Sequence, residues 1–255
     1  MTYGLWLSAG GMQVNEYRQS VMANNLANTD TVGFKRDLAV IHERRPERGT
    51  NPADARYSNP LLDPLSGGAW TRPTFTSFGQ GGLTETGRAL DVALEGDGFL
   101  VAGDGTDRRY TRDGRMTLDP DGMLRLAAGE GRFAVLDAAG VPIVLDRALG
   151  EPSIGRDGSI RQNNQTVAQL GLVDFADRTA LRKSGHSLFE QVGETEIQPA
   201  RVDVLGGYVE SSTADAMRGL VDMIEVSRAY ELNARMVTLQ DTTLGAAVTR
   251  VGRIG

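Results

Sequence analysis

The stretch NNLANTDTVGFKR, residues 24–36, combines asparagine, threonine and aspartate residues with a closing Gly-Phe-Lys-Arg. Asparagine is unfavourable inside helices and favoured in turns, because its side chain competes for backbone hydrogen bonds. The residues before the stretch have a helical pattern. The stretch therefore marks the place where the chain leaves its first helix, and the elements on either side of it define the rest of the fold.

The residues that precede this stretch follow a heptad period. Positions that step by four and three form a seam with a polar middle: Leu5, Ala9, Met12, Glu16, Gln19, Ala23 and Leu26. Val14, Tyr17 and Val21 form a second apolar row beside this seam. Gly10 and Gly11 weaken the helix by about 1 kcal/mol each relative to alanine. Such a helix is marginal alone, so we expect it to pack against a partner.

A second helix is predicted at the other end, over residues 213–248, which contain no proline. Four residues make an apolar stripe: Met217, Leu220, Val221 and Ile224. Apolar character continues less regularly through Tyr230, Ala234, Met236, Val237, Leu244 and Val248. Ser211, Ser212 and Thr213 predict an N-cap, with Asp215 in the first turn. The patterns at the two ends of the chain allow the two helices to pair.

The region between the helices has the alternation and the turn residues of β-hairpins. Residues 90–105, LDVALEGDGFLVAGDG, alternate around Gly-Asp-Gly, and residues 108–126 have turn signals at Asp113-Gly114 and Asp121-Gly122. The expected fold class is α+β, mainly β, with a β-rich body of hairpins over residues 84–208. The terminal helical domain comprises residues 1–36 and 209–250. Residues 37–83 are predicted to be an irregular, extended arm.

Composition excludes several classes of protein. The net charge of −6 does not favour a nucleic-acid partner, because phosphates attract a basic surface. The absence of cysteine excludes disulfides and thiolate zinc sites. No apolar run approaches the length of about 18 residues that a membrane span needs, so direct membrane insertion is not expected. The start of the chain lacks a basic segment followed by an apolar run, so no cleaved signal peptide is predicted.

The sequence contains no motif of an enzyme, a cofactor site or a metal site. Histidine is limited to His42 and His186, and His186 lies in a Gly-Ser context without a nucleophile elbow. Asp119 and Asp121 fit a hairpin turn better than a calcium loop, because Gly122 comes too early for an EF-hand. We therefore expect no catalytic residues, no cofactor and no metal. Acidic residues are plentiful, so a carboxylate pair for glycoside hydrolysis stays open.

Three ordered blocks resemble the bacterial flagellar basal-body rod, hook and hook-associated family of axial proteins. The first is ANNLANTDTVGFKR, with Asn24, Asn25, Leu26, Ala27, Asn28, Thr31, Gly33, Phe34 and Lys35 in matching positions. The second comprises Gly87, residues 90–93, Gly96, Gly98, Phe99 and YTRDG at residues 110–114. The third is GYVESS at residues 207–212 followed by MIEVSRAYELN at residues 223–233.

This resemblance implies a structural subunit of the flagellar rod, located in the periplasm-spanning part of the basal body. Such subunits leave the cytoplasm unfolded through the flagellar type III export machinery. They self-assemble with copies of themselves and with other rod, hook and export-apparatus proteins into a hollow drive shaft for motility, which transmits torque from motor to hook. Their terminal helices form an inner coiled coil, and the β body lies outside.

The resemblance also gives roles to individual residues. The Asn-rich stretch becomes a helix exit, in which Gly33 permits a tight turn and Phe34 anchors the chain. The expected assembly interface comprises Leu5, Met12, Val21, Asn25, Leu26, Asn28, Gly33, Phe34, Met217, Leu220, Val221, Ile224, Arg228 and Tyr230.

Within this family, the chain length and the linker at residues 72–94 resemble the proximal rod protein more than the distal rod protein or a short hook-type subunit. Two other classes stay open. A secreted β-rich glycan hydrolase would need a cleft with paired carboxylates, and a soluble binding module would pair its terminal helices within one monomer.

Overall fold

The computed structural model describes residues 2–44, 67–105 and 107–251 of the chain. It divides into two compact units. The first, here called the helical unit, contains residues 1–27, 37–75 and 216–255, and the second, the body unit, contains residues 28–36 and 76–215. The predicted α+β class is confirmed, since two long helices accompany many strands.

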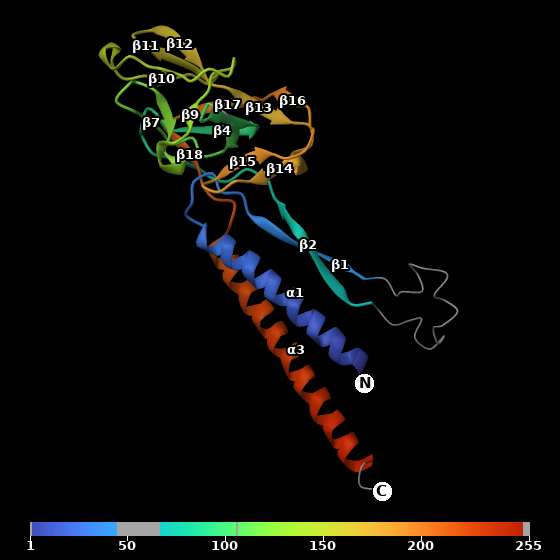
Figure 1. Cartoon of the computed structure of the whole chain (residues 1–255). Coiled ribbons are helices and arrows are strands. Elements are labelled where there is room, and N and C mark those ends of the chain that lie inside the picture. The colour runs from blue at the N-terminus through green and yellow to red at the C-terminus, as the bar shows by residue number, and fades with distance from the viewer. Residues whose placement is uncertain (1, 45–66, 106, 252–255) are drawn as a thin grey trace. The chain divides into compact units, whose positions relative to one another are not determined.

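The helical unit is built around two helices, α1 (Thr2–Ala27) and α3 (Ala216–Val251). Figure 1 shows α1 and α3 side by side and antiparallel, with the amino end of α1 and the carboxyl end of α3 at the same end of the pair. Helix α1 begins and ends close to the predicted bounds. Helix α3 begins later than predicted, because the backbone N–H of Thr213 donates to the carbonyl of Phe34 (3.0 Å). Asp215, predicted in the first turn, directly precedes the helix.

The predicted irregular arm contains regular structure, which corrects the expectation for residues 37–83. Strands β1 (Asp37–Glu43) and β2 (Ala69–Thr76) pair in a two-stranded sheet, and β3 (Leu83–Glu85) also falls in this range. Pro73 lies inside β2, and a two-stranded sheet tolerates it because each strand has one unpaired edge. The Pro- and Gly-rich composition therefore misled the prediction, and the part of the arm at residues 45–66 lies outside the described residues.

The body unit consists of short strands in several sheets. The remaining strands are β4 (Val92–Asp97), β5 (Phe99–Gly103), β6 (Arg108–Thr111), β7 (Met116–Leu118), β8 (Leu124–Leu126), β9 (Ala134–Val135), β10 (Ser153–Ile154), β11 (Ser159–Gln162), β12 (Gln165–Gln169), β13 (Leu172–Phe175), β14 (Leu181–Lys183), β15 (Leu188–Gln191), β16 (Ile197–Pro199), β17 (Arg201–Gly206) and β18 (Tyr208–Glu210). Three short 3-10 helices are η3 (Ala128–Gly131), η4 (Arg147–Leu149) and η5 (Arg178–Ala180).

The largest sheet has nine strands, with the main order β14-β15-β6-β5-β9-β8-β7; β13 pairs with β5 and with β16. A second sheet has the order β10-β11-β12, and β17 pairs with β4 and β18 with β3. The predicted turn at Asp121-Gly122 joins the β7–β8 hairpin, as expected. Asp113-Gly114 does not close a hairpin, since β6 and β7 lie apart in the sheet order and the Gly114 carbonyl accepts from the N–H of Val92 (3.0 Å).

The core of the body lies between these sheets. Its larger cluster includes the fully buried Leu94, Leu100, Leu124, Ile160 and Leu170. A second, aromatic cluster gathers rings from separate strands: Phe99, Tyr110, Phe175 and Phe189, with Phe78 packed against them. Ring centroids in this cluster lie 4.7–5.9 Å apart, mostly in edge-on arrangements that aromatic pairs prefer.

Candidate assembly interface

The antiparallel contact between α1 and α3 has a single register along the whole length of α1. Added Cβ atoms at two of the α1 glycines would meet α3 amide side chains, Gly4 against Gln240 and Gly11 against Asn233. Further along, Gln19 Nε2 donates to Ser227 Oγ at 3.3 Å. An added Cβ on Gly219 would lie 3.9 Å from the Leu26 side chain. The seam therefore contains many small and polar residues.

On α3, the face toward α1 follows a heptad. Residues that step by four and three are buried or half-buried: Gly219, Met223, Val226, Tyr230, Asn233, Val237, Gln240 and Leu244. Val226 is the most buried of them, with 1% of its surface exposed. Of the predicted interface residues on α3, only Tyr230 lies on this face.

The spacing of the predicted stripe of α3 allowed two partners, the N-terminal helix of the same chain or a helix of a neighbouring copy. The stripe lies on the face opposite α1, so the first of these two contacts is not observed. The exposed fractions are 75% for Met217, 48% for Leu220, 62% for Val221 and 48% for Ile224. Arg228 is exposed on the same side. Two apolar rows run along α3, and periodicity alone does not distinguish which of them faces the partner helix.

On α1, the observed seam is shifted from the predicted one. Ala9, Glu16, Gln19 and Ala23 of the predicted seam are exposed, and Leu5, Met12 and Leu26 are half-buried. The helical spacing of Gly4 and Gly11 places the buried Ser8 and Asn15 in the row toward α3. The second apolar row, with the buried Val14 and Val21, includes Tyr17, whose hydroxyl donates to the Arg72 carbonyl of β2 (2.9 Å).

Asn25 has a role that its turn propensity did not suggest. It lies inside the last turn of α1, and its side-chain amide pairs with the backbone of Asp37 at the start of β1. Asn25 Nδ2 donates to the Asp37 carbonyl (2.7 Å), and the Asp37 N–H donates to Asn25 Oδ1 (2.8 Å). An amide is the side chain that matches a peptide group in both directions. Asn25 therefore holds β1 against the end of α1.

Within the body unit, residues 28–36 form the connection that the sequence predicted. Asn28 accepts hydrogen bonds from Thr31, through its carbonyl (3.3 Å) and through Oδ1 (3.1 Å). Gly33 has φ +67°, which confirms the predicted tight turn, and its N–H donates to the Glu210 carbonyl (2.7 Å). A Cβ at Gly33 would lie only 2.5 Å from the backbone nitrogen of Asp113. Glycine is needed here for its backbone angle and also for space.

Phe34 is buried, as its predicted anchoring role requires. The Lys183 ammonium lies 4.0 Å from the centre of its ring, a cation–π contact. The end of this segment lies beside two other segments at the boundary of the body unit, those around Ser77 and Thr213. The Phe34 carbonyl accepts from Thr213, the Arg36 N–H donates to Thr213 Oγ1 (2.8 Å), and the Ser77 N–H donates to the Arg36 carbonyl (2.9 Å). The strands and loops that leave the body are therefore hydrogen-bonded to one another.

A buried ion cluster lies directly beneath this segment. Lys35 Nζ donates to Glu210 Oε1 (2.5 Å) and to the Gly79 carbonyl (2.8 Å), and Lys35 and Glu210 are 1% and 0% exposed. Arg112 Nη1 lies 3.4 Å from Glu210 Oε2. The Gly81 N–H also donates to Glu210 Oε1 (2.6 Å). One carboxylate thus holds two cations and a backbone amide.

Burial is the dominant electrostatic effect at this cluster. Desolvation lowers the pKa of Lys35 below its ordinary value of 10.5, while Glu210 acts in the opposite direction. Desolvation likewise lowers the pKa of Arg112, against the attraction of Glu210. Arg112 also donates to the carbonyls of Leu94 (3.3 Å) and Gly96 (2.6 Å), whereas its buried Nε has no hydrogen-bond partner among the described residues.

The cluster joins the separate sequence blocks. Lys35 belongs to the first block, Gly96 and Arg112 to the second and Glu210 to the third. The sequence placed Lys35, Arg112 and Glu210 inside motifs but did not predict that they meet. The sequence did offer one indication of this cluster, since each of the three blocks contains a charged residue. If such a charge is buried, it requires a partner of opposite sign.

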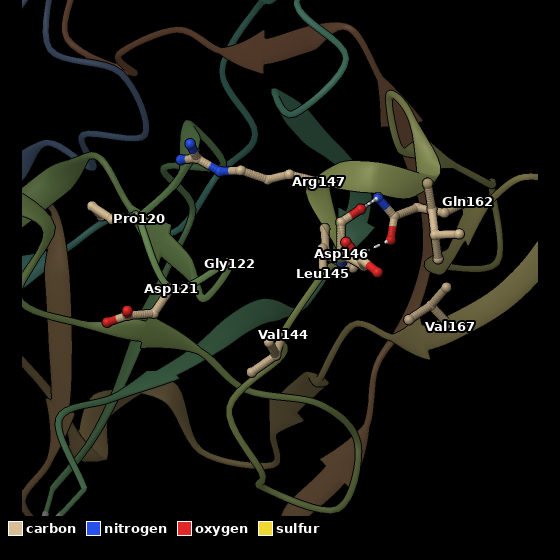
Figure 2. Close-up of a pocket in the computed structure, with 10 residues that line it drawn as sticks. Pro120, Asp121, Gly122, Val144, Leu145, Asp146, Arg147, Gln162 and Val167 are labelled. Atoms are coloured by element: carbon tan, nitrogen blue, oxygen red, sulfur yellow. Dashed lines mark hydrogen bonds between the residues drawn. The ribbon is translucent and has the colours of Figure 1, made fainter.

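A pocket of about 460 Å³ lies elsewhere in the body, at the β7–β8 turn and next to β11 and β12. Figure 2 shows Asp146 and Gln162 paired across it, with the Asp146 N–H donating to Gln162 Oε1 (3.3 Å). Gln162 Nε2 donates back to the Asp146 carbonyl (2.9 Å), and Asp146 Oδ1 caps η4. Arg147 donates to the carbonyls of Leu118 and Asp119. The hydrogen-bonding groups of Asp146, Arg147 and Gln162 named here thus bind other groups of the protein.

Comparison with known proteins agrees with the sequence blocks. The family model described as flagella basal body rod protein matches residues 7–35, and that described as flagellar basal body rod FlgEFG protein C-terminal matches residues 205–250. The flagellar basal-body rod protein FlgF of Caulobacter vibrioides is 34% identical over 236 residues, which cover 92% of this chain and 91% of the relative. The chain belongs to the flagellar basal-body rod protein family.

Other relatives include both kinds of rod protein. The rod protein FlgG of Buchnera aphidicola from Schizaphis graminum is 32% identical over 268 residues, 96% of this chain and 98% of the relative. The rod protein FlgF of Mesorhizobium japonicum is 30% identical over 262 residues, 99% of both chains. The family-model matches contain Gly33, Lys35 and Glu210, so the matched ends of this rod-family chain meet at the buried ion cluster. In the described part of the chain, neither helix is long and apolar enough to cross a membrane.

Proposed function

We propose that this chain is a structural subunit of the flagellar rod, in the proximal part of the shaft. It polymerises with copies of itself and with other rod proteins into the hollow shaft that carries torque from motor to hook. Family membership supports the rod assignment. Relatives of both the FlgF and FlgG kinds are similar at about the same identity, so the proximal assignment rests on the chain length and on the linker at residues 72–94.

The observation that carries this proposal is the outer face of α3. Met217, Leu220, Val221 and Ile224 are all about half exposed or more, and the row continues with Leu232, Met236 and Leu239, exposed by 61%, 46% and 59%. Helical spacing places these side chains opposite the face that packs on α1. An exposed apolar stripe of this kind marks an interaction surface.

The occupant we assign to this stripe is a terminal helix of a neighbouring axial subunit. Burial of one such side chain contributes about 1.5–3 kcal/mol. In a head-to-tail polymer every subunit both gives and receives the contact, so the contribution recurs along the shaft. Arg228 interrupts the stripe, and a charged residue in a helical seam favours one register over others. In this arrangement the terminal helices form the inner coiled coil of the shaft.

The same proposal includes the route to the basal body. The subunit passes through the flagellar export machinery unfolded and then folds and assembles in the periplasm-spanning rod. This part of the proposal is supported by family membership. It assigns the chain no catalytic activity and no cofactor.

The test compares Ile224→Asp with Val226→Asp. The two residues are close on α3, but Ile224 is 48% exposed and Val226 is 1% exposed. In the purified protein, Ile224→Asp should leave thermal unfolding nearly unchanged, while Val226→Asp should loosen the helix pair because it buries a charge. In cells, Ile224→Asp should be exported but should not enter the rod, and the cells should be non-motile.

Motility and basal-body composition of the Ile224→Asp strain decide the outcome. Normal swimming, with the variant present in purified basal bodies, would show that the outer face of α3 is not an interface. A large loss of stability in the purified Ile224→Asp protein would place this face in an ordinary monomer core, as the binding-module alternative requires.

A further inference from the structure

The contact between α1 and α3 contains a recurring pair that the rod-subunit role does not explain. At two places, one heptad apart on each helix, a glycine of α1 lies under an amide side chain of α3: Gly4 under Gln240 and Gly11 under Asn233. Both pairs follow the same antiparallel register. An apolar seam of leucines would tolerate sliding, whereas an amide seated over a glycine fits one position.

The space at Gly11 is filled closely. An added Cβ would lie 2.9 Å from Asn233 Oδ1, 3.0 Å from Nδ2 and 3.1 Å from Cγ. Asn233 is held in place, because its Nδ2 donates to the Ala229 carbonyl one turn earlier in α3 (3.0 Å). At Gly4 the added Cβ would lie 2.8 Å from Gln240 Nε2. The amides therefore occupy the volume that a side chain on α1 would need.

The neighbouring glycine provides the contrast. Gly10 is adjacent to Gly11 in the same helix, and an added Cβ there would approach only the Ala69 carbonyl, at 4.0 Å. A glycine in a helix interior costs about 1 kcal/mol relative to alanine. At Gly10, no contact with α3 requires a glycine. At Gly11, the packing of the Asn233 amide against the glycine offsets the loss of helix stability.

We infer that the Gly11–Asn233 pair, together with Gly4–Gln240, sets the register of α3 on α1. The pairs act as sockets on α1 and knobs on α3. They fix how far the two helices overlap along their length. They therefore also fix the level along α1 at which each residue of the outer stripe of α3 lies. The inference concerns the folded chain itself and does not depend on the rod assignment.

The experiment uses the full-length chain, which has no cysteine of its own. Cysteines at Gln19 and Ser227, whose side chains meet in the structure (3.3 Å), report the native register when joined by a short bismaleimide. Cysteines at Gln19 and Ala234 report a shift by one heptad, about 10 Å along α3. In the chain without substitutions at Gly10 or Gly11, the first cysteine pair should cross-link and the second should not.

Gly11→Ala and Gly10→Ala are then compared in both cysteine backgrounds. Overpacking of a close contact changes an equilibrium constant about tenfold or more, so Gly11→Ala should raise the ratio of shifted to native cross-linked product about tenfold. Gly10→Ala should leave it unchanged, although both substitutions raise helix propensity equally. Adding Asn233→Ala to Gly11→Ala removes the knob and should restore the native cross-link.

Either of two results would overturn the inference. Equal cross-linking in Gly11→Ala and Gly10→Ala would show that the socket is not needed for register. Failure of Asn233→Ala to restore the cross-link would show that the loss in Gly11→Ala arises from something other than the seated amide.

Discussion

Gly33→Ala should destabilise the body unit through two effects, backbone strain and a steric clash. The same substitution at Gly87 measures the backbone strain alone. Gly33 has φ +67° and Gly87 has φ +70°, so alanine is strained to the same degree at both. The left-handed backbone costs a non-glycine residue about 1–2 kcal/mol, and the loss of unfolded-chain freedom returns about 0.4–1 kcal/mol. Gly87→Ala should therefore lower the free energy of unfolding by about 1.6 kcal/mol or less.

At Gly33 a clash is added to this strain. The new Cβ would lie 2.5 Å from the Asp113 nitrogen and 2.7 Å from the Arg112 carbonyl carbon, and these backbone atoms cannot rotate away. At Gly87 an added Cβ has no neighbour within 4 Å among the described residues. Overpacking costs about 1–3 kcal/mol, so Gly33→Ala should lower the free energy of unfolding by about 2–4 kcal/mol in total.

Urea unfolding of the purified chain, followed by circular dichroism, measures both variants. Thermal unfolding should agree, at about 2–4 °C of melting temperature for each kcal/mol in a unit of this size. Equal destabilisation by Gly33→Ala and Gly87→Ala would refute the reasoning, because the close approach of residues 33 and 113 would then have no energetic consequence.

Two further substitutions test the contacts that surround this turn. Lys35→Met leaves the buried Glu210 carboxylate without its closest cation and should cost about 3–5 kcal/mol in urea unfolding. Lys183→Met removes the cation–π contact with Phe34 and should cost about 1 kcal/mol or less. Similar costs would contradict the importance of the buried pair. Asn25→Ala should cost about 1–3 kcal/mol by removing both bonds to Asp37, and Asn25→Asp should recover little, since a carboxylate accepts from the N–H but cannot donate to the carbonyl. Full recovery by aspartate in hydrogen-exchange protection of β1 would show that only one of the two bonds matters.

Much of the architecture was predictable because it depends on local chemistry. Both terminal helices follow from periodicity, the hairpin at Asp121-Gly122 from its turn residues, and the turn at Gly33 from the preference of glycine for positive φ. The strands β1 and β2 were missed because the sequence between them is rich in proline and glycine. Pairing with each other, a non-local contact, stabilises them as strands.

The details of the candidate interface needed the tertiary structure. The sequence by itself determined that α3 carries an apolar stripe at Met217, Leu220, Val221 and Ile224, and the family motifs implied that Gly33 and Phe34 form a turn and an anchor. Only the tertiary structure decided that the row with Val226 faces α1 and that Ile224 faces outward. The physical reason is that α1 offers glycines and short polar side chains, which accept the amides of Asn233 and Gln240 at close range.

The buried ion cluster follows the same rule. The sequence determined that charged residues stand inside each motif, and burial requires such charges to find partners. It did not determine the partners, because Lys35 and Glu210 are 175 positions apart and many acidic residues lie nearer along the chain. The folding of the body brings residues 28–36 and β18 to the same place, and this non-local packing decides which charges meet.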